Sequence, residues 1–362
     1  MMKKKSLASI KEIISDAKKG KIFILVDNKD RENEGDLVIP ASKANPKSIN
    51  FMAMHGRGLI CLALNKKQVD KLSLPLMSSV NKARMQTAFT VSIEAKKGIT
   101  TGISAYDRAR TIKVAINPKS KKKDIVSPGH VFPLVAKGGG VLERAGHTEA
   151  SVDISRLAKL NASSVICEVM NEDGRMARFD DLLRFSQKHK LKIASIEDLI
   201  SYRLKNEKFI TNVSSKQILI KKFGSFNLRI FKNKLDNLEH YSITKGKFIP
   251  NKPVRVRVIS VNFMNDVINL NTDIFNKSLK YLSKFSNFAL IVINNQHTNI
   301  LNGENIKTNN ILRYYGIGAQ IIKDLKIKNM ILVSRSKKKI IGLDGYGIRI
   351  FKQEIIKWKK KF

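Results

Sequence analysis

Short apolar runs alternate with helix-periodic stretches along the first 205 residues of this 362-residue chain. The stretch 6–19 places Ile10, Ile13 and Ile14 on one stripe, as an amphipathic helix does. Runs typical of buried strands lie at residues 21–27, 36–42, 58–65, 86–95 and 163–171. This alternation predicts an α+β unit, in which a mixed sheet is flanked by helices.

The pattern loosens near residues 205–215 and then begins again. Further strand-like runs lie at residues 216–231, 253–263, 288–295 and 329–335, and residues 309–327 have helical periodicity. A chain of this length exceeds one typical domain. We therefore expect two domains, residues 1–205 and residues 210–362, the second being an α/β unit.

The charge of the chain is strongly basic, with 68 Lys and Arg against 30 Asp and Glu and a formal net charge of +38. A basic surface attracts nucleic-acid phosphates, and a nucleic-acid-binding protein is one interpretation. The lysines, however, are spread from Lys3 to Lys361, and the chain has one Trp for stacking on bases. We favour solvated lysines, and binding that falls steeply with salt would identify the alternative.

Cysteine usage and hydropathy bear on location. The two cysteines, Cys61 and Cys167, have apolar neighbours, which argues against a disulfide framework and a Cys-rich zinc site and fits a reducing cytosol. Residues 1–20 lack the uninterrupted apolar run of a signal peptide. No stretch of about 18 apolar residues occurs. We expect a cytoplasmic protein without a membrane partner.

An acidic segment, DRENEGD at residues 30–36, follows the apolar run IFILV. Glu32, Glu34 and Asp36 would repel one another unless a cation lay among them. Mg²⁺ prefers oxygen ligands of this kind. The segment therefore indicates a magnesium site, and the alternative is a solvated acidic loop in which Arg31 pairs locally.

A second cluster, GGGVLERAGHTEASVDISRL, occupies residues 138–157. Thr148 is placed to cap the helix that follows, which would leave backbone N–H groups free at its start. With Arg144 nearby, such a helix start is a phosphate site. His147 offers a ring nitrogen to a metal, although a lone histidine is more often structural.

Three single residues add weaker signals. His130, in SPGHVFPL, lies between a glycine and an apolar strand, where it is either functional or a turn histidine. Asp107, in KGITTGISAYDRAR, is suited to a polar ligand. Glu168 lies inside the apolar strand VICEVMN. Because an unpaired carboxylate is costly to bury, Glu168 is an acid/base candidate.

Five segments together resemble 3,4-dihydroxy-2-butanone 4-phosphate synthase, an enzyme of riboflavin biosynthesis. They are DRENEGDLVIPA, FTVSIEAKKGITTGISAYDRARTI, SPGHVFPL, RAGHTEASVDI and ICEVMNEDG, and the resemblance covers about residues 6–203. It implies conversion of D-ribulose 5-phosphate to 3,4-dihydroxy-2-butanone 4-phosphate and formate. It also implies Mg²⁺ or Mn²⁺, two ions per active site, and a homodimer with active sites at the subunit boundary.

The same resemblance implies roles for individual residues. Glu32 and His147 match metal ligands, and His130 and Glu168 match residues essential for catalysis. The positions matching substrate-binding residues are Arg31, Glu32, Asp36, Arg144, Ala145, Gly146, His147, Thr148 and Glu168. Glu34, Cys61 and Asp107 match supporting positions.

The C-terminal part resembles GTP cyclohydrolase II, through KKFGSFNLRIF and the stretch LRYYGIGAQ to GLDGYGIRI. That family implies three zinc-binding cysteines after a strand like PVRVRVIS, but VNFMNDVINLNTD stands there and no cysteine follows Cys167. Its Arg- and Gly-rich stretch is replaced by NNQHTNIL, and His240 and His297 cannot rebuild a Cys-type site. We expect a zinc-free domain without cyclohydrolase activity, the alternative being a bifunctional enzyme that still acts on GTP.

Overall fold

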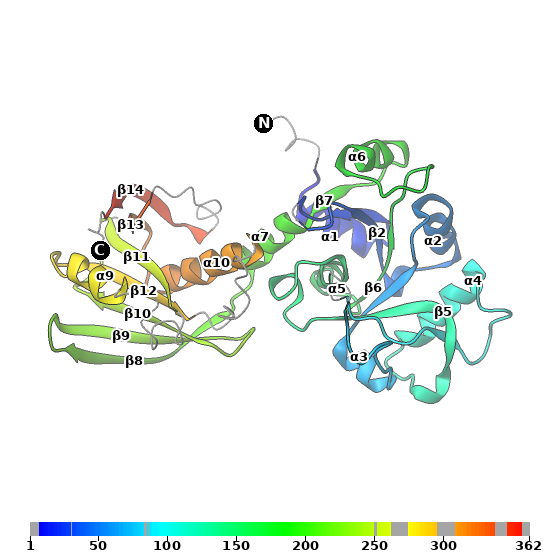
Figure 1. Ribbon diagram of the computed structural model, residues 1–362, viewed down its shortest axis with the longest axis horizontal. Coiled ribbons are helices and arrows are strands. Elements are labelled where there is room, and N and C mark those ends of the chain that lie inside the picture. Colours follow the sequence, from blue (N-terminus) through cyan, green and yellow to red (C-terminus); the bar gives the residue numbers. More distant parts are fainter. Residues whose placement is uncertain are drawn as a thin grey trace. The chain divides into compact units, whose positions relative to one another are not determined.

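The computed structural model describes two compact units, Met1–Ile200 and Ser201–Phe362. Each contains a mixed β-sheet with helices, as expected from the sequence (Figure 1). The described residues are 7–29, 31–82, 85, 87–249, 252–261, 274–294, 308–336 and 346–356, with only the backbone for 308–315. Among these residues, no helix is both long and apolar enough to cross a membrane.

The N-terminal sheet has seven strands in the order β4-β5-β3-β6-β2-β1-β7. The pairs β1–β7 and β3–β5 are parallel, and the other neighbouring strands are antiparallel. The strands are β1 (Phe23–Val26), β2 (Gly35–Pro40), β3 (Cys61–Asn65), β4 (Ile93–Ala95), β5 (Ile125–Ala136), β6 (Ser163–Glu168) and β7 (Ile193–Ser195).

Helices accompany this sheet, and the last one continues past the unit boundary at Ile200. They are α1 (Ile10–Lys18), α2 (Pro46–Phe51), α3 (Lys66–Lys71), α4 (Ala105–Ala115), α5 (His147–Leu157), α6 (Phe179–Lys188) and α7 (Ile196–Asn206), with short 3-10 turns at Ala41–Lys43, Lys122–Asp124 and Gly140–Leu142 and a π turn at Met52–Gly56. As predicted, Ile10, Ile13 and Ile14 are buried. Asn45 caps α2, and Pro46 is the first residue of that helix.

Different side chains pack on the two faces of the sheet. One core joins Ile39, Leu62 and other strand residues to Ile49 of α2 and Ile112 of α4, and each such side chain contributes about 1.5–3 kcal/mol on burial. On the face covered by α5 the packed side chains are small, and the hydroxyls of Ser155 and Ser164 are 2.8 Å apart. Small side chains let α5 lie close across β1, β2, β3, β5 and β6. The first turn of α5 therefore reaches the sheet edge that carries the candidate site.

The C-terminal sheet also has seven strands, in the order β14-β13-β11-β12-β10-β9-β8. The neighbouring pairs β8–β9, β9–β10 and β10–β12 are antiparallel. The pairs β12–β11, β11–β13 and β13–β14 are parallel. The elements are β8 (Ile210–Ile220), β9 (Gly224–Asn233), β10 (Glu239–Lys245), β11 (Val254–Val261), α9 (Ile274–Leu282), β12 (Phe288–Asn294), α10 (Thr308–Asp324), β13 (Asn329–Ser334) and β14 (Arg349–Ile355).

Several elements differ from the sequence-based expectation. The apolar run 86–95 forms a regular strand only at Ile93–Ala95, and the run 216–231 is divided between β8 and β9.

The segments 262–273 and 295–307, which bear on the missing cysteines and the replaced Arg- and Gly-rich stretch, lie outside the described residues, as does His297. His240 is buried in β10, where its Nδ1 accepts the backbone N–H of Asn294 at 3.1 Å.

Candidate active site

One edge of the N-terminal sheet gathers the polar residues predicted from the sequence. Strands β1 and β6 end at this edge, and β2 and β3 begin there. Asp36 and Glu168 are register partners, so their side chains leave the same face of the sheet. Cys61 is the partner of Phe132, two residues after His130. The strand registers therefore bring Asp36, Glu168, Cys61 and His130 to the same edge.

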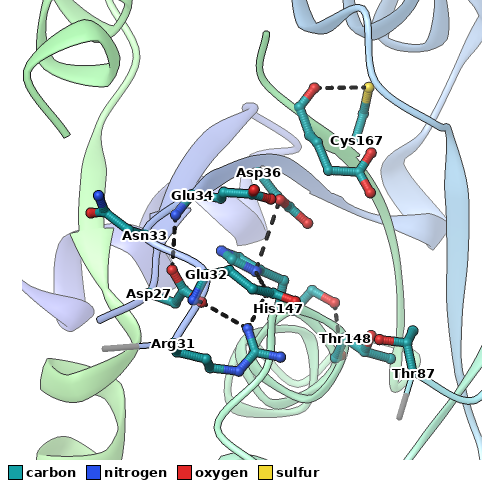
Figure 2. Close-up of polar contacts among 12 residues, drawn as sticks. Asp27, Arg31, Glu32, Asn33, Glu34, Asp36, Thr87, His147, Thr148 and Cys167 are labelled. Carbon is teal, nitrogen blue, oxygen red and sulfur yellow. Dashed lines mark hydrogen bonds and ion pairs between the residues drawn. The ribbon is translucent and has the colours of Figure 1, made fainter. Parts of the chain in front are cut away.

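The acidic loop between β1 and β2 is folded around Asp27, a residue that the sequence analysis missed. The carboxylate of Asp27 is 1% exposed and accepts the backbone N–H groups of Glu32 at 3.2 Å and Glu34 at 2.9 Å. It also accepts a bond from the Arg31 guanidinium at 2.8 Å, and Arg31 pairs with Glu32 as well (Figure 2). The available signal was an acid directly after a buried strand.

The acidic loop lies against the first residue of α5. Nδ1 of His147 is 3.7 Å from Oε2 of Glu32 and 3.9 Å from Oδ1 of Asp36 (Figure 2). One ligand atom each of Asp27, Glu32 and His147 lie within 4.8 Å of one another. The Nε2 atom of His147 is buried and has no hydrogen-bond partner among the described residues. Two carboxylates and an imidazole with an unpartnered nitrogen fit a divalent cation.

Burial and neighbouring charge set the ionisation of this cluster. Burial raises the pKa of Glu32, but the His147 ring and the Arg31 guanidinium outweigh burial and bring this pKa to about 2. Burial lowers the pKa of His147, yet the Asp36 and Glu32 carboxylates outweigh it and raise this pKa. For Asp36, burial raises the pKa against the opposing charge of His147. Glu32 is thus ionised between two cationic partners, the Arg31 guanidinium and the His147 ring.

The N-terminus of α5 corrects one expectation: Thr148 is not the N-cap. Gly146 is the N-cap, His147 is the first helical residue, and Thr148 lies buried in the first turn. A Cβ added at Gly146 would lie 2.3 Å from Nη1 of Arg144. A larger residue at Gly146 would have to displace the Arg144 guanidinium, and Ala145, also buried, links the two residues.

Arg144 is held by three partners. It donates to Oε2 of the buried Glu149 at 2.7 Å, to the hydroxyl of Thr87 at 2.9 Å and to the carbonyl of Met85 at 3.0 Å. Burial raises the pKa of Glu149, and the Arg144 charge opposes that rise. These contacts fix the Arg144 guanidinium beside the start of α5.

Glu168 and the two cysteines occupy the middle of the sheet edge. Oε2 of Glu168 accepts the backbone N–H of Leu59 at 2.8 Å, and a Cβ at Gly58 would lie 2.6 Å from the same oxygen. Cys61 and Cys167 are buried and free. Burial raises the pKa of both thiols, that of Cys167 to about 12, so both are protonated at neutral pH.

His130 and Asp107 belong to a neighbouring cluster on β4, β5 and the loop before α4. Nδ1 of His130, whose side chain is 45% exposed, pairs with Glu94, which the sequence analysis did not single out. Asp107 accepts the hydroxyl of Thr100 at 2.7 Å and the backbone N–H of Gly102 at 3.1 Å. Asp107 thus folds the loop that packs on Glu94 and His130.

The fold and site define a class before any relative is considered. A centre of two carboxylates and an imidazole at one edge of a mixed sheet, next to a helix start with a fixed arginine, suits a protein that binds a divalent cation.

Known families match both units. Residues 11–202 match the family model of 3,4-dihydroxy-2-butanone 4-phosphate synthase, and residues 211–355 match that of GTP cyclohydrolase II. The chain is 44% identical to the riboflavin biosynthesis protein RibBA of Aquifex aeolicus over 96% of its own length and 92% of the relative's. It is 43% identical to the 3,4-dihydroxy-2-butanone 4-phosphate synthase of Photobacterium phosphoreum, over 95% and 98%.

Solved structures of the synthase are also similar to this chain. The crystal structure of a two-domain 3,4-dihydroxy-2-butanone 4-phosphate synthase from A. baumannii has a TM-score of 0.82 and 39% identity, covering 97% of this chain and 100% of that one. A synthase in complex with two magnesium ions has a TM-score of 0.53 and 38% identity, covering 56% and 99%. The chain therefore belongs to the 3,4-dihydroxy-2-butanone 4-phosphate synthase family and is an enzyme of riboflavin biosynthesis.

Proposed function

We propose that the N-terminal unit converts D-ribulose 5-phosphate to 3,4-dihydroxy-2-butanone 4-phosphate and formate with the help of Mg²⁺ or Mn²⁺, two ions per active site. The observation that carries this proposal is the cluster of Asp27, Glu32 and His147, whose ligand atoms lie within 4.8 Å of one another. The number of ions rests on the homologous synthase in complex with two magnesium ions.

Glu32 and His147 are the proposed ligands. Glu32 is ionised at neutral pH, and His147 keeps a buried nitrogen without a partner among the described residues. Asp27 positions Glu32 by accepting its backbone N–H. A bound divalent cation would supply stabilisation of negative charge on adjacent substrate oxygens.

Proton transfer is assigned to Glu168 and His130. Enediol formation requires removal of a proton beside a carbonyl, and the later rearrangement requires further transfers. Glu168 is fixed by the Leu59 N–H and faces the same side as Asp36, and His130 is paired with Glu94. Both therefore present a defined atom at the sheet edge.

Substrate binding is assigned to the acidic loop and to the start of α5. Arg31 and Asp36 flank the ligand cluster and suit the sugar hydroxyls. Arg144 and the backbone N–H groups of His147 and Thr148 suit the phosphate. The backbone N–H of Gly146 donates to the carbonyl of Arg144 at 2.9 Å and closes the turn before the helix. Ala145 completes that turn.

The proposal includes a homodimer. Exposed apolar side chains lie near the segments that carry Glu168, His130 and Asp107: Leu59 is 41% exposed, Val126 41%, Ile103 53% and Tyr106 76%. Burial of such residues against a second copy would remove them from water. Light scattering of the purified chain tests this point, and a monomer at micromolar concentration would contradict it.

We infer that the C-terminal unit does not open GTP. No cysteine follows Cys167, whereas the cyclohydrolase resemblance implies a Cys-bound zinc. Relatives matched over nearly their whole length, from Photobacterium phosphoreum and Neisseria meningitidis, are named for the synthase alone. The bifunctional alternative is favoured by the 38% identity to a bifunctional riboflavin biosynthesis protein of Arabidopsis thaliana. GTP consumption with added Zn²⁺ distinguishes the two.

Metal binding by itself tests the ligand assignment without relying on turnover. Mn²⁺ titration followed by electron paramagnetic resonance should show tight sites in the native chain that weaken in Glu32→Gln and His147→Gln. Glu172→Gln, at an 82% exposed side chain, is the matched control and should bind as the native chain does. Equal Mn²⁺ binding in all variants would remove Glu32 and His147 as ligands.

A further inference from the structure

A second concave site of the N-terminal unit has no residue in common with the acidic centre. It is a cavity of about 600 Å³ lined by the loop after β4, helix α4 and the segment 117–124 that leads into β5. Six of its side chains are cationic and exposed, and a single carboxylate, that of Asp124, lies among them. The six cations are Lys96, Lys97, Arg110, Lys113, Lys119 and Lys123.

These cations are not neutralised within the part of the chain that the structure describes. None of the six has a carboxylate within 4.0 Å there. Asp124 is itself engaged, because its Oδ2 accepts the backbone N–H of Lys121 at 2.8 Å. Charges closer than the Debye length, about 8 Å at physiological salt, repel one another with little screening. Lysines solvated on a convex surface can spread apart, whereas a cavity lined by one sign of charge focuses the field on whatever enters it.

The walls of the cavity are fixed to one another. The backbone N–H of Lys96 donates to the carbonyl of Asp124 at 3.0 Å, which joins the loop after β4 to the segment before β5. Gly98 has a φ of +78° and lets that loop pass over α4, where an added Cβ would lie 3.0 Å from Nε of Arg110. Nε of Arg110 in turn donates to the carbonyl of Lys97 at 3.5 Å. The cationic side chains therefore project from a frame that exists before any ligand arrives.

We propose that this cavity binds an oligophosphate, either the phosphate chain of a nucleoside triphosphate or inorganic triphosphate. A single phosphate ester carries a charge of about −1.5 to −2 and would leave most of the six cations uncompensated. A chain of three phosphates carries more charge and can contact all three walls, with Arg110 supplying a forked pair of donors. The site lies outside the proposed catalytic machinery and does not depend on the assignment of that machinery.

Calorimetric titration of the full-length chain with inorganic triphosphate and with GTP, in metal-free buffer at low salt, tests the proposal. The double variant Arg110→Gln/Lys113→Gln removes two cations of the cavity. The double variant Lys67→Gln/Lys71→Gln removes two exposed cations of α3, outside the cavity, and is the matched control. We expect the cavity variant to bind triphosphate about tenfold more weakly or worse, and the control to bind as the native chain does.

The remaining outcomes distinguish inorganic triphosphate from a nucleoside triphosphate as the ligand, and the cavity from other places of binding. Equal affinity for the two ligands supports recognition of the phosphate chain alone, and tighter binding of GTP supports recognition of the chain with an added nucleoside contact. Triphosphate binding that survives in the cavity variant and is lost in Arg144→Gln would place the anion at the catalytic centre and overturn the proposal. So would equal weakening in both double variants, or binding of RNA oligonucleotides without binding of triphosphate.

Discussion

Asp36 on β2 and Glu168 on β6 are register partners, so two carboxylates share one face of the sheet edge beside His147. Burial raises the pKa of Asp36, and the charge of Glu168 adds to that rise while His147 opposes it. Glu34 behaves similarly, since burial and the neighbouring Glu32 raise its pKa. The edge therefore concentrates acids that a cation would stabilise.

Replacing a proposed ligand should abolish the activity without unfolding the chain. Glu32→Gln and His147→Gln keep the size of each side chain, so we expect formate release to fall by at least roughly a hundredfold while the melting temperature changes little. Steady-state kinetics at saturating Mg²⁺, with Glu172→Gln as control, provide the check. Native-like turnover in either variant would show that the Asp27–Glu32–His147 cluster is not the metal site.

Arg144 should have two separable roles. Arg144→Ala removes a proposed phosphate contact and leaves Glu149, whose side chain is 1% exposed, without its ion-pair partner. We expect a higher KM and a loss of roughly 3–5 kcal/mol of unfolding free energy. The double variant Arg144→Ala/Glu149→Gln should recover much of that stability but not the KM. Recovery of both by the double variant would mean that Arg144 acts only through packing.

Glu94 should position His130. Glu94→Gln removes the carboxylate that pairs with Nδ1 of the ring, so we expect kcat to fall while the KM for the sugar phosphate stays near the native value. The kcat of His130→Ala is the lowest value that we expect Glu94→Gln to reach. If His130→Ala is impaired and Glu94→Gln is not, the ring is held by other contacts.

Several buried strands were predictable from the sequence, whereas β10 and β14 were not. Strands β1, β2, β3 and β6 are buried along nearly their whole length and read as continuous apolar runs. The residues of β14 are all exposed or half-buried, and β10 is largely polar in sequence, so neither strand has a continuous apolar run. Their conformation is decided by pairing, of β10 with β9 and β12 and of β14 with β13.

The candidate site was predictable where motifs carried it. Asp27 was missed although its partners Glu32 and Glu34 follow closely in sequence, because a single acid after a strand does not reveal how the loop folds around it. Glu94 was missed because its partner, His130, lies on another strand. The cap at Thr148 was wrong because the helix begins earlier, at His147, with Gly146 as its N-cap packed against the Arg144 guanidinium. The assigned roles of the site residues stay predictions until the variants are measured.

His189 should make stability depend on pH. Its ring packs on Phe185 and His55 with centroids 4.4 Å and 4.6 Å away, and burial, then His55 and Lys188, lower its pKa from the ordinary 6.5. The folded state therefore favours the neutral ring, and its contribution is present above pH 6.5 and lost as the pH falls through the lowered value. We expect His189→Phe to flatten the fall in melting temperature between about pH 7.5 and about pH 5. Parallel curves for the two proteins would assign the pH dependence to other groups.

The central claim concerns which of the two units is catalytic. Formate release from D-ribulose 5-phosphate with Mg²⁺, measured on the same preparation as GTP consumption with Zn²⁺, tests it most directly. We predict formate from the sugar phosphate and no turnover of GTP. Turnover of GTP would contradict the loss of cyclohydrolase activity, and the absence of formate would contradict the assignment of the Asp27–Glu32–His147 cluster as the active site.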